Sequence, residues 1–165
     1  MGLFNQLLGK KKIKSDILIL SPLKGEVIPL SEVKDEAFAC GALGGGITVE
    51  PSEGKVVSPV NGTVASLFPT KHAIGIVSEE GAEVLIHIGL DTVQLEGKYF
   101  EAHVEQGDKV KAGELLVTFE LDKLKEEGYG TQVPVLITNT PMYAGIEVLA
   151  KEKVDYQDDL LKLKL

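Results

Sequence analysis

The sequence predicts an all-β protein, built as one antiparallel β-sandwich or barrel-like domain with one or two short helical turns. Three observations favour this class: short runs rich in β-branched residues recur along the chain, turn-forming residues separate them, and helical periodicity is nearly absent. A length of 165 residues suits a single apolar core. We expect a separate tail over residues 1–14 and one domain over residues 15–165.

The expected elements follow one another from Ile17 onward. Strands are predicted over 25–28, 47–50, 62–68, 73–77, 83–88 and 115–119, because each run is dominated by residues that fit a pleated sheet. Turns are predicted at 51–54, 60–62, 79–81, 106–108 and 111–113, where glycine is present. A short helix is expected over 122–127 with Asp122 as its N-cap. The alternating run over 160–165 predicts a final strand with one buried face.

The first 14 residues differ from the rest of the chain. They carry four lysines and no acidic residue, and their apolar side chains fall at helical spacing. Two interpretations stay open for residues 1–14: weak contact with an anionic membrane surface, or a disordered tail.

The composition excludes several classes of protein. The net charge is −8 and the chain contains no arginine, so we do not expect nucleic acid as a ligand. No apolar run approaches the ~20 residues of a membrane span, and no signal-peptide pattern is present. The single cysteine, Cys40, excludes an internal disulfide and fits a reducing compartment. We therefore expect a cytoplasmic location, with or without peripheral contact at the inner face of the membrane.

Two histidines, His72 and His87, lie in neighbouring predicted strands. A turn joins these strands, so an antiparallel hairpin is expected to display both rings on one surface. Alternation places one set of side chains in the core, Val84, Ile86, Ile88 and Leu90, and another set outward, Leu85, His87 and Gly89. An exposed imidazole pair suits phosphoryl transfer or metal ligation, and it also occurs in ordinary sheets. The residues alone leave these three interpretations open.

Several motifs in sequence order resemble those of the glucose-type IIA component of the bacterial phosphoenolpyruvate:sugar phosphotransferase system. They are Ser21-Pro-Leu-Lys-Gly-Glu, Val57-Ser-Pro-Val-Asn-Gly, Phe68-Pro-Thr-Lys-His-Ala-Ile-Gly, the segment 81–93 and Leu121-Asp. The resemblance covers residues 19–139 and implies an antiparallel β-sandwich. Residues 1–14 resemble the amphipathic tail of free-standing members, which favours the membrane-contact interpretation.

The resemblance implies a phosphocarrier. In that family, a histidine matching His87 accepts a phosphoryl group from the phosphohistidine of HPr and donates it to the cysteine of the IIB domain of a sugar permease. His72 matches the second active-site histidine, and Thr70 matches the threonine that orients its ring. The backbone carbonyl of Gly89 is expected to fix the tautomer of His87.

The resemblance also implies a partner-binding rim around the two histidines. The apolar docking residues of the family match Phe38, Phe68, Leu85 and Ile88, and the acidic residues that meet a basic surface of HPr match Asp35 and Asp91. No resident metal or cofactor is expected, although a zinc ion shared by His72 and His87 with a partner's carboxylate stays open.

Two other functions stay open beside the phosphocarrier. The first is a regulatory binding protein whose phosphorylation state controls target transporters or enzymes. The second is a zinc-dependent peptidase of a related β-sandwich type, which predicts a His-x-His ligand pair. That pair is missing here, because Ile88 and Gly89 follow His87.

Overall fold

The structure is a computed structural model that describes residues 15–165, so the predicted tail over residues 1–14 lies outside the described residues. The strands are β2 (Ile17–Leu20), β3 (Gly25–Pro29), β4 (Gly45–Pro51), β5 (Lys55–Val57), β6 (Gly62–Leu67), β7 (Ala73–Ser78), β8 (Glu83–His87), β9 (Phe100–Ala102), β10 (Lys109–Val110), β11 (Leu115–Phe119), β12 (Val133–Ile137), β13 (Gly145–Val148), β14 (Lys153–Val154) and β15 (Asp159–Lys164). The helices are α1 (Glu36–Ala39) and α2 (Leu121–Glu126), with 3-10 turns η2 (Leu30–Glu32), η3 (Thr92–Leu95) and η4 (Thr140–Met142).

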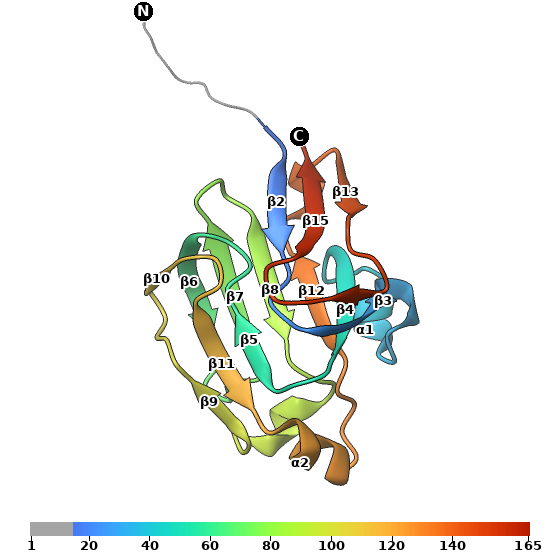
Figure 1. Cartoon of the computed structure of the whole chain (residues 1–165), viewed down its shortest axis with the longest axis vertical. Coiled ribbons are helices and arrows are strands. Elements are labelled where there is room, and N and C mark those ends of the chain that lie inside the picture. The colour runs from blue at the N-terminus through green and yellow to red at the C-terminus, as the bar shows by residue number, and fades with distance from the viewer. Residues whose placement is uncertain (1–14) are drawn as a thin grey trace, which may run out of the picture.

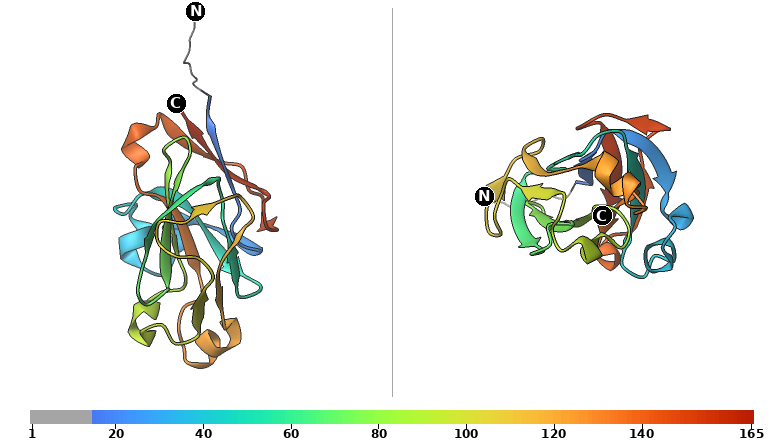
Figure 2. Two further views of the ribbon diagram at one scale, coloured as in Figure 1. Left: turned by 90° about the vertical axis from the view of Figure 1, so that its left-hand side faces the viewer. Right: turned by 90° about the horizontal axis from the view of Figure 1, so that it is seen from below.

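Over residues 15–165 the strands form three sheets, and every strand pairing in this part of the chain is antiparallel, which confirms the predicted all-β class. The largest sheet has eight strands in the order β10-β6-β7-β8-β12-β4-β3-β14, and two three-stranded sheets follow the orders β5-β11-β9 and β13-β15-β2. Figures 1 and 2 show β2, β13 and β15 at one end of the molecule and α2 at the other. Within the described residues, no helix is long and apolar enough to cross a membrane.

One main core fills the space between the sheets, and β8 shows how the sequence pattern builds it. Val84, Ile86 and Ile88 are at most 1% exposed, whereas Leu85 and His87 between them are only partly buried. The predicted alternation is therefore confirmed from Val84 to Ile88, but it is wrong for Leu90, which packs with Phe38 in a separate cluster because the chain turns at Gly89 (φ +80°). The outward residues of β8 lie on the opposite face of the eight-stranded sheet from the core.

A second, smaller cluster of buried side chains covers that outward face near the end of β8. It consists of Val33, Phe38, Leu90 and Leu136. Phe38 comes from α1, which is held in place because the Asp35 carboxylate accepts a hydrogen bond from the Ala37 N–H at 3.0 Å. The segment that contains α1 thus packs an aromatic ring onto the sheet beside His87.

The short helix predicted over 122–127 is present as α2, one residue earlier than expected. The predicted N-cap is wrong: the flanking residue is Glu120, which makes no side-chain capping bond, and Asp122 lies inside the first turn. A carboxylate in the first turn is still favourable there, because the exposed N–H groups at a helix N-terminus carry partial positive charge. The sequence pattern alone did not show whether Asp122 is the N-cap or lies in the first turn of α2.

The final strand is confirmed as β15, but its buried face differs from the prediction. Leu160 and Leu161 are both 0% exposed, although strict alternation allows only one of two neighbours to face the core. The pairing of β15 with β2 shifts register between Asp159 and Leu161, and such a bulge turns two successive side chains inward.

Candidate functional site

The hairpin of β7 and β8 brings the two predicted histidines together. Ala73 at the start of β7 pairs with His87 at the end of β8, and the Ile88 N–H donates a hydrogen bond of 2.6 Å to the carbonyl of His72. The ring centroids of His72 and His87 are 4.9 Å apart, with the ring planes at 84°. The two imidazoles are therefore in edge-to-face contact, held by backbone pairing on both sides.

The hydrogen bond at Nδ1 of His87 determines which ring nitrogen can react. Nδ1 lies 2.8 Å from the carbonyl oxygen of Gly89. A carbonyl only accepts hydrogen bonds, so Nδ1 must carry the proton. In the neutral ring, Nε2 then holds the free lone pair.

The position of the Gly89 carbonyl depends on glycine. Gly89 has φ +80°, and a Cβ at this residue would lie 2.6 Å from Cγ2 of Thr92. Because of both features, any residue other than glycine would be destabilising at this position. The hydroxyl of Thr92 also donates to the carbonyl of Ile88 at 2.5 Å, which closes the turn between His87 and η3.

The surroundings of His87 favour its neutral form. Burial lowers the pKa of His87, while the Gly89 carbonyl and the carboxylates of Asp35 and Asp91 raise it by smaller amounts. A lowered pKa means that most His87 rings carry a free lone pair at pH 7.

His72 is more deeply buried than we expected. We predicted that both rings would lie on the surface, but His72 is only 4% exposed. The ring of Phe68, at 5.4 Å and 80°, and the ring of His87 lie against it. Burial, followed by the nearby His87 charge, lowers the pKa of His72 to about 4. Its Nδ1 is 2.6 Å from Oγ1 of Thr70, so the predicted neighbour of this ring is in hydrogen-bond contact with it.

The residues predicted to form an apolar rim fall into different positions. Phe68 is 42% exposed and Leu85 is partly buried, so both offer surface beside the histidines. Phe38 is 6% exposed and packs against His87 with a centroid distance of 4.9 Å. Ile88 is 0% exposed in the main core, so its assignment to the rim is wrong. Strand parity explains the error, because Ile88 has the opposite orientation to His87.

The two predicted acidic residues lie near His87, since both influence its pKa. Asp91 is exposed and precedes η3 in the left-handed region at φ +61°. Asp35 is partly buried and caps α1. They therefore place two carboxylates close enough to the partly buried imidazole to raise its pKa.

Two residues that hold the turn after His87, Thr92 and Gly130, are not among the residues predicted from the sequence. Besides Thr92, the carbonyl of Gly130 accepts a hydrogen bond of 2.9 Å from the Leu90 N–H. The Gly-Leu-Asp-Thr order after Ile88 marks a turn, which was a usable signal for Thr92. Gly130 is distant in sequence, and no local pattern links it to His87.

Among residues 15–165, no group of three or more His, Cys, Asp or Glu side chains is placed to hold a metal ion.

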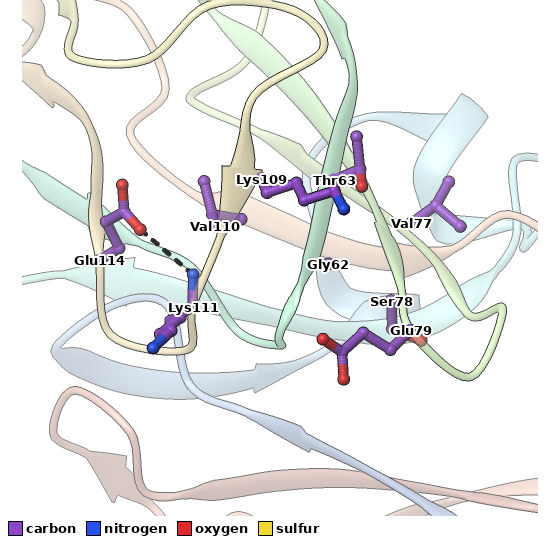
Figure 3. Close-up of a pocket in the computed structure, with 9 residues that line it drawn as sticks. All are labelled: Gly62, Thr63, Val77, Ser78, Glu79, Lys109, Val110, Lys111 and Glu114. Atoms are coloured by element: carbon purple, nitrogen blue, oxygen red, sulfur yellow. Dashed lines mark hydrogen bonds between the residues drawn. The ribbon is translucent and has the colours of Figure 1, made fainter.

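A pocket of about 460 Å³ lies away from the histidines and is shown in Figure 3. It is lined by Gly62, Thr63, Val77, Ser78, Glu79, Lys109, Val110, Lys111 and Glu114. Val77 and Ser78 end β7, whereas His72 precedes its start, so this pocket is at the opposite end of that strand from the histidines.

Comparisons with known proteins agree with this geometry. The family model described as "phosphoenolpyruvate-dependent sugar phosphotransferase system, EIIA 1" matches residues 17–143. The glucose-specific EIIA component of Staphylococcus aureus is 43% identical over 153 residues, which cover 92% of each chain. The solved structure of glucose permease IIA from Mycoplasma capricolum has a TM-score of 0.80 and 35% identity, covering 91% of this chain and 96% of that one.

Other relatives are much longer than this chain. The beta-glucoside-specific EIIBCA component of Halalkalibacterium halodurans is 54% identical over 145 residues, which cover 88% of this chain and 23% of the relative. The chain thus spans about a quarter of the length of such relatives. Because the family model covers most of the chain and full-length relatives align across it, the chain belongs to the EIIA 1 family of the phosphoenolpyruvate-dependent sugar phosphotransferase system.

Proposed function

We propose that this chain is the phosphocarrier of a sugar phosphotransferase system. It accepts a phosphoryl group from phospho-HPr on Nε2 of His87 and donates it to the cysteine of a IIB permease domain during sugar uptake. The observation that carries the proposal is the bond from Nδ1–H of His87 to the Gly89 carbonyl, which leaves Nε2 unprotonated beside a second imidazole. Relatives that unite EIIB, EIIC and EIIA in one chain support the IIB domain as a partner.

The chemistry begins with a neutral nucleophile. The Nε2 lone pair attacks phosphorus, a new N–P bond forms, and the N–P bond of the donor breaks with its electrons returning to the donor imidazole. The lowered pKa of His87 keeps this lone pair available at pH 7. In the second step the cysteine thiolate of the IIB domain attacks phosphorus, an S–P bond forms while the N–P bond to His87 breaks, and the electron pair of that bond returns to Nε2.

His72 stabilises the phosphoryl oxygens as a neutral hydrogen-bond donor. With a pKa of about 4, its ring is uncharged at pH 7. We assign the hydroxyl of Thr70 as donor to Nδ1 of His72, across the observed 2.6 Å. The remaining ring proton then lies on Nε2, where it can donate to a phosphoryl oxygen. The two histidines thus adopt opposite tautomers, one to attack and one to donate.

The surface around the histidines suits a basic, partly apolar partner. Phe68 and Leu85 offer apolar contact, and Asp35 and Asp91 add negative charge. The chain has no arginine, so a partner is the source of any guanidinium that neutralises the transferring group. HPr fits this requirement as donor.

Further expectations about cofactors, location and regulation belong to this proposal. The transfer needs no resident cofactor, and it does not require a zinc ion shared by His72 and His87 with a partner. Residues 1–14 make weak contact with the membrane surface, and the protein works in the cytoplasm, peripheral to the inner face of the membrane. A regulatory role controlled by phosphorylation would use the same surface. Membership of the EIIA 1 family removes the reason to consider a zinc peptidase.

The test is labelling with phosphoenolpyruvate, enzyme I and HPr, followed by mapping of an acid-labile, base-stable phosphate. We expect His87→Ala to abolish labelling, and His72→Gln to accept phosphate but fail to pass it to a IIB domain. His103→Ala is the matched control, because His103 is exposed and bonds to Thr118 at 2.9 Å, away from the pair. Normal labelling of His87→Ala contradicts the proposal.

A further inference from the structure

The carbonyl that holds the tautomer of His87 belongs to a peptide group that is fixed at both ends. The Gly89–Leu90 peptide accepts from Nδ1–H of His87 at its oxygen, at 2.8 Å. The N–H of the same peptide, on Leu90, donates to the carbonyl of Gly130 at 2.9 Å. A peptide group is planar, so a bond at its N–H also sets the direction of its C=O. Hydrogen bonds connected in this way polarise and strengthen one another.

Gly130 packs so closely against the turn after His87 that a side chain at this residue would crowd Leu90. A Cβ on Gly130 would lie 3.0 Å from Cδ1 and 3.2 Å from Cβ of Leu90. A Cβ on Gly89 would lie 3.0 Å from the carbonyl oxygen of Gly130. The side chain of Leu90 is 6% exposed in the same small cluster as Phe38, whose ring contacts His87. Displacement at Gly130 therefore reaches His87 both through the peptide and through packing.

The position of Gly130 is set by the end of α2. Gly128 has φ +83° and donates its N–H to the carbonyl of Lys125 at 3.0 Å, and the Tyr129 N–H donates to the carbonyl of Leu124 at 3.0 Å. These two bonds form a Schellman motif, which ends the helix with a defined change of direction. Leu124 is 0% exposed in the main core, so the motif is anchored. Gly130 follows this motif directly, so its position depends on where the helix ends.

We propose that Gly130 is a positioning residue for phosphoryl transfer: its carbonyl, acting through the Gly89–Leu90 peptide, holds His87 in the tautomer whose Nε2 is the nucleophile. This proposal rests on the proposed function of His87, and it adds the end of α2 to the structure that supports the reaction. This arrangement of the Gly130 carbonyl and the Gly89–Leu90 peptide requires a glycine at residue 130, because a Cβ there would push against Leu90.

The variant Gly130→Ala tests the link, and Gly145→Ala is its matched control. Neither glycine has a positive φ, so alanine is acceptable to both backbones, and a Cβ on Gly145 would meet nothing within 4 Å. We expect the ¹⁵N shifts of the His87 ring in Gly130→Ala to move toward a mixture of tautomers, with protonation appearing at Nε2. The rate of phosphorylation by phospho-HPr should fall about fivefold, the factor for losing one ordinary hydrogen bond. Gly145→Ala should match the unsubstituted chain in both measurements.

Leu90→Ala separates the hydrogen bond from packing. It keeps the Leu90 N–H and the Gly130 carbonyl but removes most of the side chain between Gly130 and Phe38. We expect the His87 ring to stay in the Nδ1–H tautomer in this variant. If Leu90→Ala shifts the ring as strongly as Gly130→Ala, or if Gly130→Ala leaves the ring shifts unchanged, the proposal is overturned. The ring shifts need no phosphoryl donor, so this result stands apart from a failure of His87 to accept phosphate.

Discussion

Substitution of Gly89 by alanine should destabilise the protein through its backbone conformation and through a clash with Thr92. Gly89 has φ +80°, where a residue with a Cβ costs about 1 to 2 kcal/mol. The new Cβ would also lie 2.6 Å from Cγ2 of Thr92, well inside van der Waals contact. Thr92 is 0% exposed, so its methyl group has no free space to move into. Overpacking of this kind costs about 1 to 3 kcal/mol.

Together these effects predict a loss of about 2 to 5 kcal/mol in the free energy of unfolding for Gly89→Ala. The second variant, Thr92→Ser, removes the obstructing methyl and keeps the hydroxyl that donates to Ile88. In the double variant the overlap with the Thr92 methyl disappears, whereas the backbone cost and the 3.0 Å approach to the Gly130 carbonyl oxygen remain. The double variant should therefore be less destabilised than the sum of the two single variants by about 1 to 3 kcal/mol.

Urea unfolding at pH 7 of the unsubstituted chain, both single variants and the double variant measures this coupling directly. Equal m-values are required, so that the midpoints report the native state. Strict additivity within about 0.5 kcal/mol would refute the contact between Gly89 and Thr92 as the source of the effect. Gly89→Ala with unchanged stability would refute the requirement for glycine as well.

Three further predictions concern the histidines. The pKa of His72 is about 4 in the folded state, against an ordinary value of 6.5. The neutral ring therefore contributes its full stabilisation above pH 6.5, and this contribution of up to about 3 kcal/mol is lost as the pH falls toward 4. The pH dependence of unfolding of His72→Gln should lack this part. Thr70→Val should slow phosphoryl transfer about tenfold by freeing the His72 ring, and Thr70→Ser should retain most of the rate in the same stopped-flow assay. Asp91→Asn keeps a residue that tolerates φ +61° and removes a carboxylate that raises the pKa of His87, so NMR titration should show a lower pKa; an unchanged value contradicts the electrostatic contribution.

Local periodicity was enough to predict the strand that carries His87. The alternation over β8 has one apolar set and one mixed set, and in a strand only one solution puts the apolar set inward. The same rule placed Ile88 in the core. Matching residues to the family assigned Ile88 to the docking rim instead, and the structure shows that the parity argument was the better guide.

Other features were not accessible from the sequence because they depend on tertiary contacts. The burial of His72 arises when Phe68 and His87 pack against its ring. The double burial of Leu160 and Leu161 arises from a register shift against β2, at the other end of the described chain. The bond from Leu90 to Gly130 joins two turns that share no sequence pattern. In each case a partner distant in sequence decides the environment.

The pairing of β2 with β15 also has a consequence for the order of folding. Ile17 pairs with Leu163, so this contact closes nearly the whole chain into a loop and carries the highest entropic cost of any strand pairing described. The hairpin of β7 and β8 closes only a short turn, and it contains both histidines or their immediate neighbours. We expect the two imidazoles to meet early, while the terminal sheet forms late and its amides exchange with solvent soonest.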